Sequence, residues 1–270
     1  MSRFGVPGHR AALLLCTASL VACTTAPGAP PPGETRDRVT ASDQTEASRR
    51  ANVRLQLASA YFADGQLTTA LDEVKQALVA DPKMAEAFNM RGLIYAGLGD
   101  NVLAEESFQR ALQLSPRDAD VMQNYGWYLC MQKRYVEAEA QFEQALAQPQ
   151  NRDATRTLLA QGVCEARAGQ LAQAERTLMR AYALDTSNPA IALNLSEVLF
   201  QRGEYERARF YIRRVNAQPQ QSTAQTLWLA ARIEYRSGNV QVAKEIGQQL
   251  VGRYPKSPEA SAFQQGKFDG

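Results

Sequence analysis

The chain has 270 residues, of which 45% are hydrophobic and 21% are charged. A chain of this size and composition can bury a substantial core, which excludes disorder throughout, and its length suits one large or two ordinary domains. Its formal net charge is only +2, and His9 is its single histidine.

The first 22 residues have the pattern of a secretory signal peptide. Arg3 and Arg10 precede an uncharged run over residues 11–22, which is too short for the roughly 20 residues that span a bilayer as a helix. The run ends in Leu20-Val21-Ala22-Cys23, which resembles a bacterial lipobox. The resemblance implies cleavage before Cys23 and acylation of that residue. An ordinary signal peptide that happens to end in cysteine is the alternative.

Cleavage changes the charge and the available chemistry. The mature chain loses two arginines and His9, so its positive and negative side chains balance, and no nucleic-acid partner is indicated. A chain without histidine cannot form His-based metal sites or Ser-His-Asp triads. We therefore expect no enzyme activity, no cofactor, no metal and no small-molecule substrate.

Residues 23–48 are predicted to be the lipidated cysteine and a disordered Pro/Ser/Thr linker. The segment holds four prolines and only one large apolar residue, Val39, so it cannot bury enough surface to fold. A coil of this length reaches roughly 25–30 Å. In many bacteria an aspartate after the lipidated cysteine retains a lipoprotein in the inner membrane, and here Thr24 follows instead. The expected location is the periplasmic face of the outer membrane, with Cys23 as the anchor.

Residues 49–270 form an internal repeat. A small residue opens the second helix of each unit at intervals of 34 to 36 residues, at Ala70, Ala104, Ala138, Ala174, Ala208 and Ala243. A period of 34 resembles the tetratricopeptide repeat, a helix–turn–helix unit. We expect an all-α, right-handed superhelix of six repeats, with residues 258–265 as a C-terminal capping helix. The small residues Gly92, Gly126, Gly162 and Ser196 are expected to let neighbouring helices approach closely.

Some positions depart from the repeat pattern. Arg54 and Glu234 stand where apolar residues are expected, and Lys133 replaces the glycine that recurs between the two helices. Acidic pairs in the second helices, such as Glu105 with Glu106, are expected on solvated faces, as are Glu137 and Glu139.

Two cysteines remain in the repeat region, Cys130 and Cys164, on the first helices of repeats three and four. Such helices pack side by side, and the periplasm is oxidising, so the pair is a candidate disulfide. Two separately buried thiols are the alternative.

The first helices of a tetratricopeptide superhelix line its concave face. Inward positions recur every third or fourth residue, and we expect a mixed protein-binding groove that suits an apolar or extended peptide. For each residue alone, plain packing is as good an account as binding. The candidates for this concave-face binding site are Leu55, Ser59, Phe62, Asn89, Leu93, Trp127 and Phe200.

Three local stretches carry a more specific resemblance. Residues 123–130 (Gln-Asn-Tyr-Gly-Trp-Tyr-Leu-Cys), residues 162–165 (Gly-Val-Cys-Glu) and residues 227–234 in repeat six resemble the PilW/PilF family of type IV pilus biogenesis lipoproteins. The resemblance implies a pilotin, an outer-membrane lipoprotein that binds secretin subunits and promotes their localisation and assembly into the multimeric pore. Leu55 and Phe62 in the first repeat are the predicted secretin contact.

Two other functions remain open from the sequence. One is a lipoprotein scaffold for general envelope assembly, either of outer-membrane barrels or as an activator of peptidoglycan synthesis. The other is a soluble periplasmic enzyme subunit, which would give no membrane fraction after Cys23→Ser.

Overall fold

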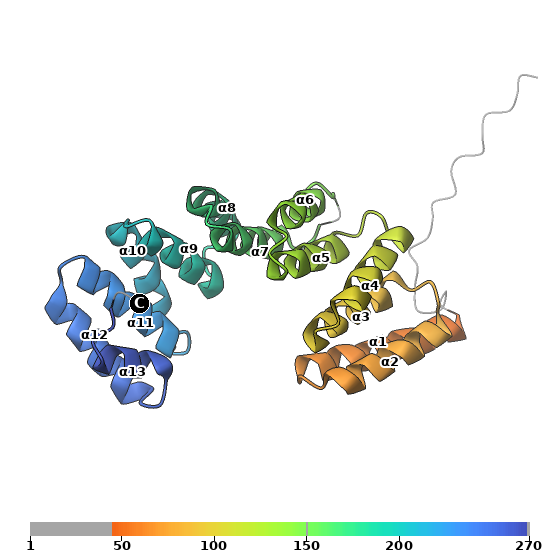
Figure 1. Ribbon diagram of the computed structural model, residues 1–270, viewed down its shortest axis with the longest axis horizontal. Coiled ribbons are helices and arrows are strands. Elements are labelled where there is room, and N and C mark those ends of the chain that lie inside the picture. The colour runs from red at the N-terminus through yellow and green to blue at the C-terminus, as the bar shows by residue number, and fades with distance from the viewer. Residues whose placement is uncertain (1–44, 150, 269–270) are drawn as a thin grey trace, which may run out of the picture. The chain divides into compact units, whose positions relative to one another are not determined.

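The computed structural model describes residues 45–149 and 151–268, and these residues form helices, turns and loops without a strand (Figure 1). The expected signal peptide, Cys23 and the linker up to residue 44 lie outside the described residues. The helices are α1 (Glu46–Ala63), α2 (Leu67–Ala80), α3 (Ala85–Leu98), α4 (Asn101–Leu114), α5 (Ala119–Met131), α6 (Tyr135–Leu146), α7 (Ala154–Arg167), α8 (Leu171–Leu184), α9 (Pro189–Gln201), α10 (Tyr205–Asn216), α11 (Ala224–Arg236), α12 (Val240–Arg253) and α13 (Pro258–Gln264).

The first helix begins earlier than expected. Thr45 caps α1 by accepting a hydrogen bond from the backbone N–H of Ser48 at 3.1 Å, so the helix starts at Glu46 rather than at the expected boundary of 49. A threonine at this position satisfies a backbone donor that the helix itself leaves unpaired. None of the helices in the described part of the chain is both long and apolar enough to cross a membrane.

The helices form six consecutive pairs, α1 with α2 through α11 with α12, followed by α13. The six marker alanines are all fully buried. The small residues of the first helices lie against the residue four positions after the marker. A Cβ added at Gly92 would lie 2.8 Å from Phe108, and one at Gly126 would lie 3.0 Å from Phe142. The expected close approach of the two helices is confirmed at these positions.

The turn inside each repeat requires a left-handed residue. The recurring glycines between the paired helices have φ between 74° and 84°, and Lys133 adopts φ 62° at the equivalent place in repeat three. The N–H of Lys133 donates to the carbonyl of Cys130 at 3.0 Å, and that of Arg134 donates to the carbonyl of Leu129 at 2.9 Å. Repeat three therefore keeps the turn geometry despite the absence of glycine, at the steric cost of a Cβ in this conformation.

Successive first helices pack against one another. The Cα atoms of α1 and α3, α3 and α5, α5 and α7, α7 and α9, and α9 and α11 approach within 8 Å, whereas in the described residues no second helix approaches the next second helix in this way. The first helices therefore form a tighter inner layer and the second helices an outer one, which is the arrangement of a tetratricopeptide superhelix.

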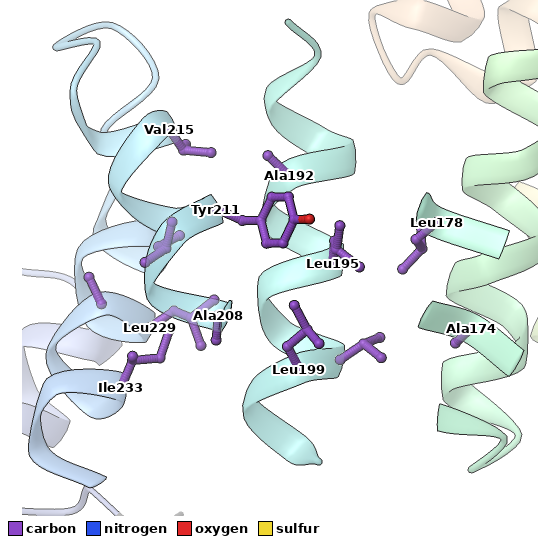
Figure 2. Close-up of a cluster of buried hydrophobic side chains, with 13 residues drawn as sticks. Ala174, Leu178, Ala192, Leu195, Leu199, Ala208, Tyr211, Val215, Leu229 and Ile233 are labelled. Carbon is purple, nitrogen blue, oxygen red and sulfur yellow. The ribbon is translucent and has the colours of Figure 1, made fainter. Parts of the chain in front are cut away.

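The largest part of the core spans repeats four to six (Figure 2). Leu195 and Leu199 of α9 are fully buried between α8 on one side and α10 and α11 on the other. Burial of such side chains contributes about 1.5–3 kcal/mol each. Because each repeat shares its core with the next, the array is stabilised by neighbour contacts.

The two charged residues that depart from the repeat pattern, Arg54 and Glu234, both form ion pairs. Arg54 pairs with Glu73 of α2 at 2.9 Å. Glu234, which is only 2% exposed, lies 2.9 Å from Arg209 Nε and accepts a 2.9 Å hydrogen bond from Arg213 Nη2. Both cations come from α10, so this ion pair joins repeat five to repeat six.

The expected capping helix is present as α13. Gly247 of α12 takes the place of the large residue found four positions after the marker in earlier repeats, and Phe263 of α13 fills the space over it. Leu227 and Leu250 are buried beneath this cap, in contact with the buried Ala260 of α13.

Candidate functional site

The residues expected to form the binding groove all lie on first helices. Leu55, Ser59 and Phe62 are on α1, Asn89 and Leu93 on α3, Trp127 on α5 and Phe200 on α9. Ser59 is exposed, and the other six are half-buried. These side chains therefore belong to one layer of the array, partly within its packing and partly accessible to a partner.

Several of these residues contact the next first helix along the array. Asn89 accepts a 3.2 Å hydrogen bond from Asn124 Nδ2 of α5. The guanidinium of Arg167 on α7 lies 5.4 Å from the centre of the Trp127 ring, and that of Arg232 on α11 lies 4.6 Å from the centre of the Phe200 ring. Both arginines lie within the range of cation–π contacts. Trp127 and Phe200 are thus each covered on one side by a cation from the following repeat.

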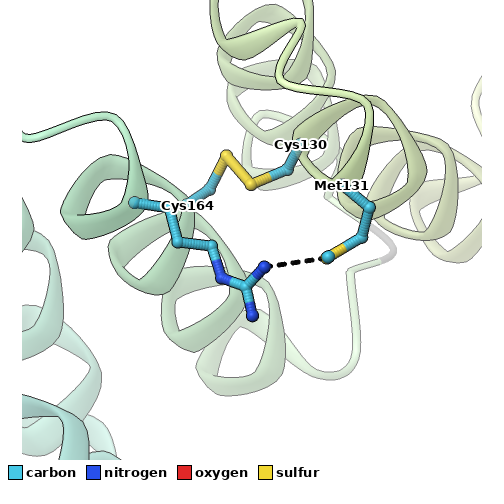
Figure 3. Close-up of a disulfide and its surroundings, with 4 residues drawn as sticks. Cys130, Met131 and Cys164 are labelled. Atoms are coloured by element: carbon cyan, nitrogen blue, oxygen red, sulfur yellow. Dashed lines mark hydrogen bonds between the residues drawn. A yellow bond between two sulfur atoms is a disulfide. The ribbon is translucent and has the colours of Figure 1, made fainter.

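The disulfide lies in this same layer (Figure 3). Cys130 of α5 is bonded to Cys164 of α7, with their Cα atoms 5.8 Å apart, and both residues are buried. Beside it, Arg167 Nη1 donates to Met131 Sδ at 3.2 Å. The bond fixes the first helices of repeats three and four to each other at the middle of the array.

The outer end of the first repeat carries exposed apolar side chains. Val53 and Leu57 of α1 are 56% and 40% exposed. In repeat two, Ala87 occupies the position equivalent to Val53 and is fully buried, because a repeat precedes it. Phe62, by contrast, packs against the core of repeats one and two. The apolar surface at this end is therefore wider than the two residues that the sequence indicated.

One acidic residue expected on a solvated face is part of a partly buried polar network. Glu105 of α4 accepts hydrogen bonds from the Tyr125 hydroxyl at 2.8 Å and from Arg134 Nη1 at 2.7 Å. The hydrogen bond from Arg134 lowers the pKa of Glu105, and burial together with the bond to Glu105 raises the pKa of Tyr125 to about 12. The network joins α4, α5 and the start of α6.

Glu139 was also expected on a solvated face. It lines an acidic cleft of about 380 Å³ between α6 and the α7–α8 pair. The amide of Gln173 donates to Glu139 at 3.3 Å and to Glu165 at 2.9 Å, and Thr177 donates to Glu165 at 3.0 Å. Burial raises the pKa of both carboxyls. Glu165 is only 2% exposed, so its ionised form is costly at this position.

The arrangement is suited to binding a protein segment. Among the described residues no group of three or more His, Cys, Asp or Glu side chains could hold a metal ion. The first helices offer aromatic rings, guanidinium groups and amides across successive repeats. Arg167 and Arg232 were not among the residues that the sequence pattern indicated for this surface, although their repeat positions place them on first helices.

Fold and surface together define a tetratricopeptide-repeat protein, a class of scaffold for protein–protein interaction. Four overlapping segments of the chain match the tetratricopeptide-repeat family: residues 83–151, 126–189, 165–227 and 225–257.

Comparison with individual proteins identifies the family within this class. The solved structure of PilW, described as a widely conserved type IV pilus biogenesis factor, is 32% identical over 79% of this chain and 98% of that chain, with a TM-score of 0.74. The solved structure of Pseudomonas aeruginosa PilF gives 27% identity and a TM-score of 0.70 over 82% of this chain and 100% of that chain. The type IV pilus assembly protein PilF of Pseudomonas aeruginosa is 29% identical over 210 residues, 78% of this chain and 83% of that protein. The chain belongs to the PilW/PilF family of tetratricopeptide-repeat proteins.

Proposed function

We propose that this protein is a non-enzymatic pilotin for type IV pilus biogenesis. In this role it is anchored to the outer membrane through a lipid on Cys23, binds secretin subunits and promotes their localisation and multimerisation. The observation that carries the proposal is the similarity to PilW, which extends over 98% of the PilW chain and therefore includes the whole repeat array rather than one common repeat.

The proposed mechanism is an increase in local concentration. A lipid anchor and a linker that reaches roughly 25–30 Å hold the array near the membrane surface. A partner that binds the array is then confined to that surface, where its encounters with further subunits become frequent. The array supplies the binding surface and the lipid determines the location of the protein, so the repeats need no catalytic activity.

The first repeat is the proposed place of secretin contact. Leu55 and Phe62 are partly accessible on α1, and Val53 and Leu57 of the same helix are exposed. Apolar side chains at an open end of the array provide area that a partner can bury. Leu57 is the better residue to substitute because it is exposed. A change at Phe62 would also disturb the core against which that residue packs.

The deciding experiment is deletion of the gene followed by assays for heat-resistant secretin multimers in the outer membrane and for twitching motility. Loss of both, restored by the wild-type chain, supports the proposal. Normal multimers and twitching would contradict it. Envelope defects with intact pili would favour the scaffold for general envelope assembly instead.

Two point variants refine the test. Leu57→Asp is expected to abolish secretin capture, whereas Val79→Asp, at an 84% exposed position on α2 of the same repeat, should leave it unchanged. Equal capture by both variants would exclude the first-repeat surface. Cys23→Ser is expected to release the chain from the membrane fraction.

A further inference from the structure

The last three described residues, 266–268, turn back from α13 onto α11. Gly266 has φ 67°, its N–H donates to the Phe263 carbonyl at 2.9 Å, and the N–H of Lys267 donates to the Ala262 carbonyl at 3.0 Å. This pair of hydrogen bonds is a Schellman motif, which ends a helix and reverses the chain. We refer to residues 266–268 as the tail. The direction of the tail is therefore set by the backbone conformation of Gly266.

Phe268 lies in a cluster of aromatic side chains. Its ring stacks on Tyr235 of α11, with centroids 4.2 Å apart and planes at 12°. It also lies 5.3 Å from the ring of Trp228 on the same helix and meets Phe263 edge-on at 5.9 Å. Arg232 Nε donates to the backbone carbonyl of Phe268 at 3.2 Å. The tail is thus held by one aromatic side chain and one backbone group.

The three α11 residues that hold the tail occupy inward positions of the repeat. The marker alanines of repeats five and six are 35 residues apart, so Trp228, Arg232 and Tyr235 correspond to Leu193, Glu197 and Phe200 of α9. Phe200 is one of the inward candidates expected from the sequence, and Leu193 and Glu197 precede it on α9 at the same spacing of three or four residues. Phe268 therefore lies where a bound partner segment would lie in the last repeat.

The contact continues into repeat five. The Arg232 guanidinium that holds the Phe268 carbonyl also lies 4.6 Å from the centre of the Phe200 ring, and Phe200 in turn lies 5.7 Å from the ring of Tyr205. A single arginine thus connects the segment on α11 with an aromatic residue of the preceding first helix.

We propose that the inner face of α11 is a binding site for a peptide segment that carries one aromatic side chain, and that Phe268 occupies this site in the free chain as an intramolecular ligand. Recognition is by ring stacking on Tyr235, by a tilted ring contact with Trp228 and by donation from Arg232 to a backbone carbonyl, so the site selects an aromatic residue rather than a particular sequence. The proposal does not depend on which protein supplies the segment.

The tail competes with such a segment. A short covalent connection gives an effective concentration on the order of millimolar, so a partner segment must bind more strongly than the tail to displace it. Tyr235 remains 38% exposed with Phe268 in place, so the tail leaves part of the site accessible. Partner binding at this site is therefore weakened by the tail and strengthened by its removal.

The test uses the full mature chain with Phe268→Ala, in which the site is open. The probe is a synthetic peptide with the sequence of residues 264–270, and the control peptide has alanine in place of the phenylalanine. The chain has two tryptophans, so a Trp127→Phe background in both proteins makes Trp228 the only fluorescent tryptophan. Titration of its emission then reports occupancy of the site.

The Phe268→Ala chain is expected to bind the phenylalanine peptide saturably and at least tenfold more tightly than the chain that retains Phe268. The alanine peptide should bind neither chain. Equal affinity of both chains, or no preference for the phenylalanine peptide, would overturn the proposal. Adding Trp228→Ala to the open chain, with binding followed by calorimetry, should remove the interaction, and retained binding would contradict the assigned site.

Circular dichroism checks that the open chain keeps its helices. Should Phe268→Ala unfold the array, Phe268→Leu replaces it, because leucine keeps an apolar contact but cannot stack. The leucine variant is expected to bind the phenylalanine peptide more tightly than wild type, and an affinity equal to that of wild type would again overturn the proposal.

Discussion

Gly162 of α7 lies directly against Leu178 of α8, so closely that a Cβ at position 162 would be 2.6 Å from Leu178 Cγ and 3.4 Å from its backbone nitrogen. The two residues meet at the centre of repeat four, where the first and second helices cross. A side chain at position 162 therefore requires Leu178 or the helices themselves to shift. Helix spacing inside the repeat therefore depends on this contact.

Gly162→Ala is expected to destabilise the protein by about 1–3 kcal/mol, because the added methyl overpacks the helix crossing. Gly252→Ala is the matched control, since Gly252 is also helical but has no neighbouring atom within 4 Å of an added Cβ. That variant should gain up to about 1 kcal/mol from helix propensity. Urea denaturation of both variants measures the contrast, and equal effects would contradict the packing account.

Lys133→Gly is expected to stabilise the protein by about 1 kcal/mol, because Lys133 has φ 62° and glycine adopts this conformation without a steric penalty. The reciprocal change, Gly169→Lys, puts a side chain into the equivalent turn of repeat four, where φ is 79°. It should cost a similar amount. Thermal unfolding followed by circular dichroism checks the pair, and a loss of stability for Lys133→Gly would show that the lysine side chain itself stabilises the turn.

Removing the disulfide by Cys130→Ser with Cys164→Ser is expected to cost about 3–4 kcal/mol in the chain-entropy description, since the cross-link joins residues 34 apart. Urea denaturation of the wild-type protein with and without dithiothreitol should give the same difference. The reductant should have no effect on the double variant. Two free thiols in the non-reduced protein, counted by mass spectrometry after alkylation, would contradict the bond.

Glu234→Ala is expected to destabilise the protein by about 3 kcal/mol, because it leaves Arg209, whose side chain is 13% exposed, without its buried partner. Burial opposes ionisation of Glu234, but the hydrogen bonds from Asn239 and Arg213 and the charge of Arg209 outweigh it and lower its pKa. The stability from this ion pair is therefore present above the ordinary glutamate pKa and is lost as the pH falls through the lowered value. Denaturation at pH 7 compares the variant with Glu206→Ala, whose carboxylate is exposed and whose loss should cost less than 1 kcal/mol.

Glu165 is expected to show the opposite pH dependence. Burial raises its pKa, so its contribution to stability is present below the ordinary glutamate pKa and is lost as the pH rises through the raised value. Glu165→Gln removes the buried charge and should increase stability at pH 7 by roughly 1 kcal/mol, with a smaller gain at pH 4. Urea denaturation at the two pH values measures this. A variant less stable than wild type at both would show that the carboxylate is needed for the bonds from Gln173 and Thr177.

Much of the fold could be predicted from the sequence because the helices of each repeat pack through residues that recur at fixed positions. The spacing of the marker alanines, all fully buried in the structure, fixed the number of helix pairs. The recurring glycines indicated the turns, and the small residues of the first helices indicated the close crossings. Each of these signals depends on contacts within one repeat, so periodicity alone carries them.

The surface was less predictable, since exposure depends on what neighbouring repeats cover. Phe62 has an inward position in the pattern but packs against the core of repeats one and two, whereas Val53 is exposed on α1, the first helix of the described residues. Glu139 and Glu165 were indistinguishable in sequence from solvated charges, and only the approach of α6 to α7 and α8 brings them to one amide, that of Gln173.

The sequence by itself determined the all-helical repeat architecture and the absence of histidine from the repeats, and it indicated Cys130 and Cys164 as a candidate pair. Only the tertiary structure decided which inward side chains are covered. It places the guanidinium of Arg232 over Phe200 and the ring of Phe268 on Tyr235, contacts between residues 32 and 33 positions apart. No local periodicity encodes such pairs, because they depend on the rotation between successive repeats and on the turn at Gly266 that returns the tail to the array.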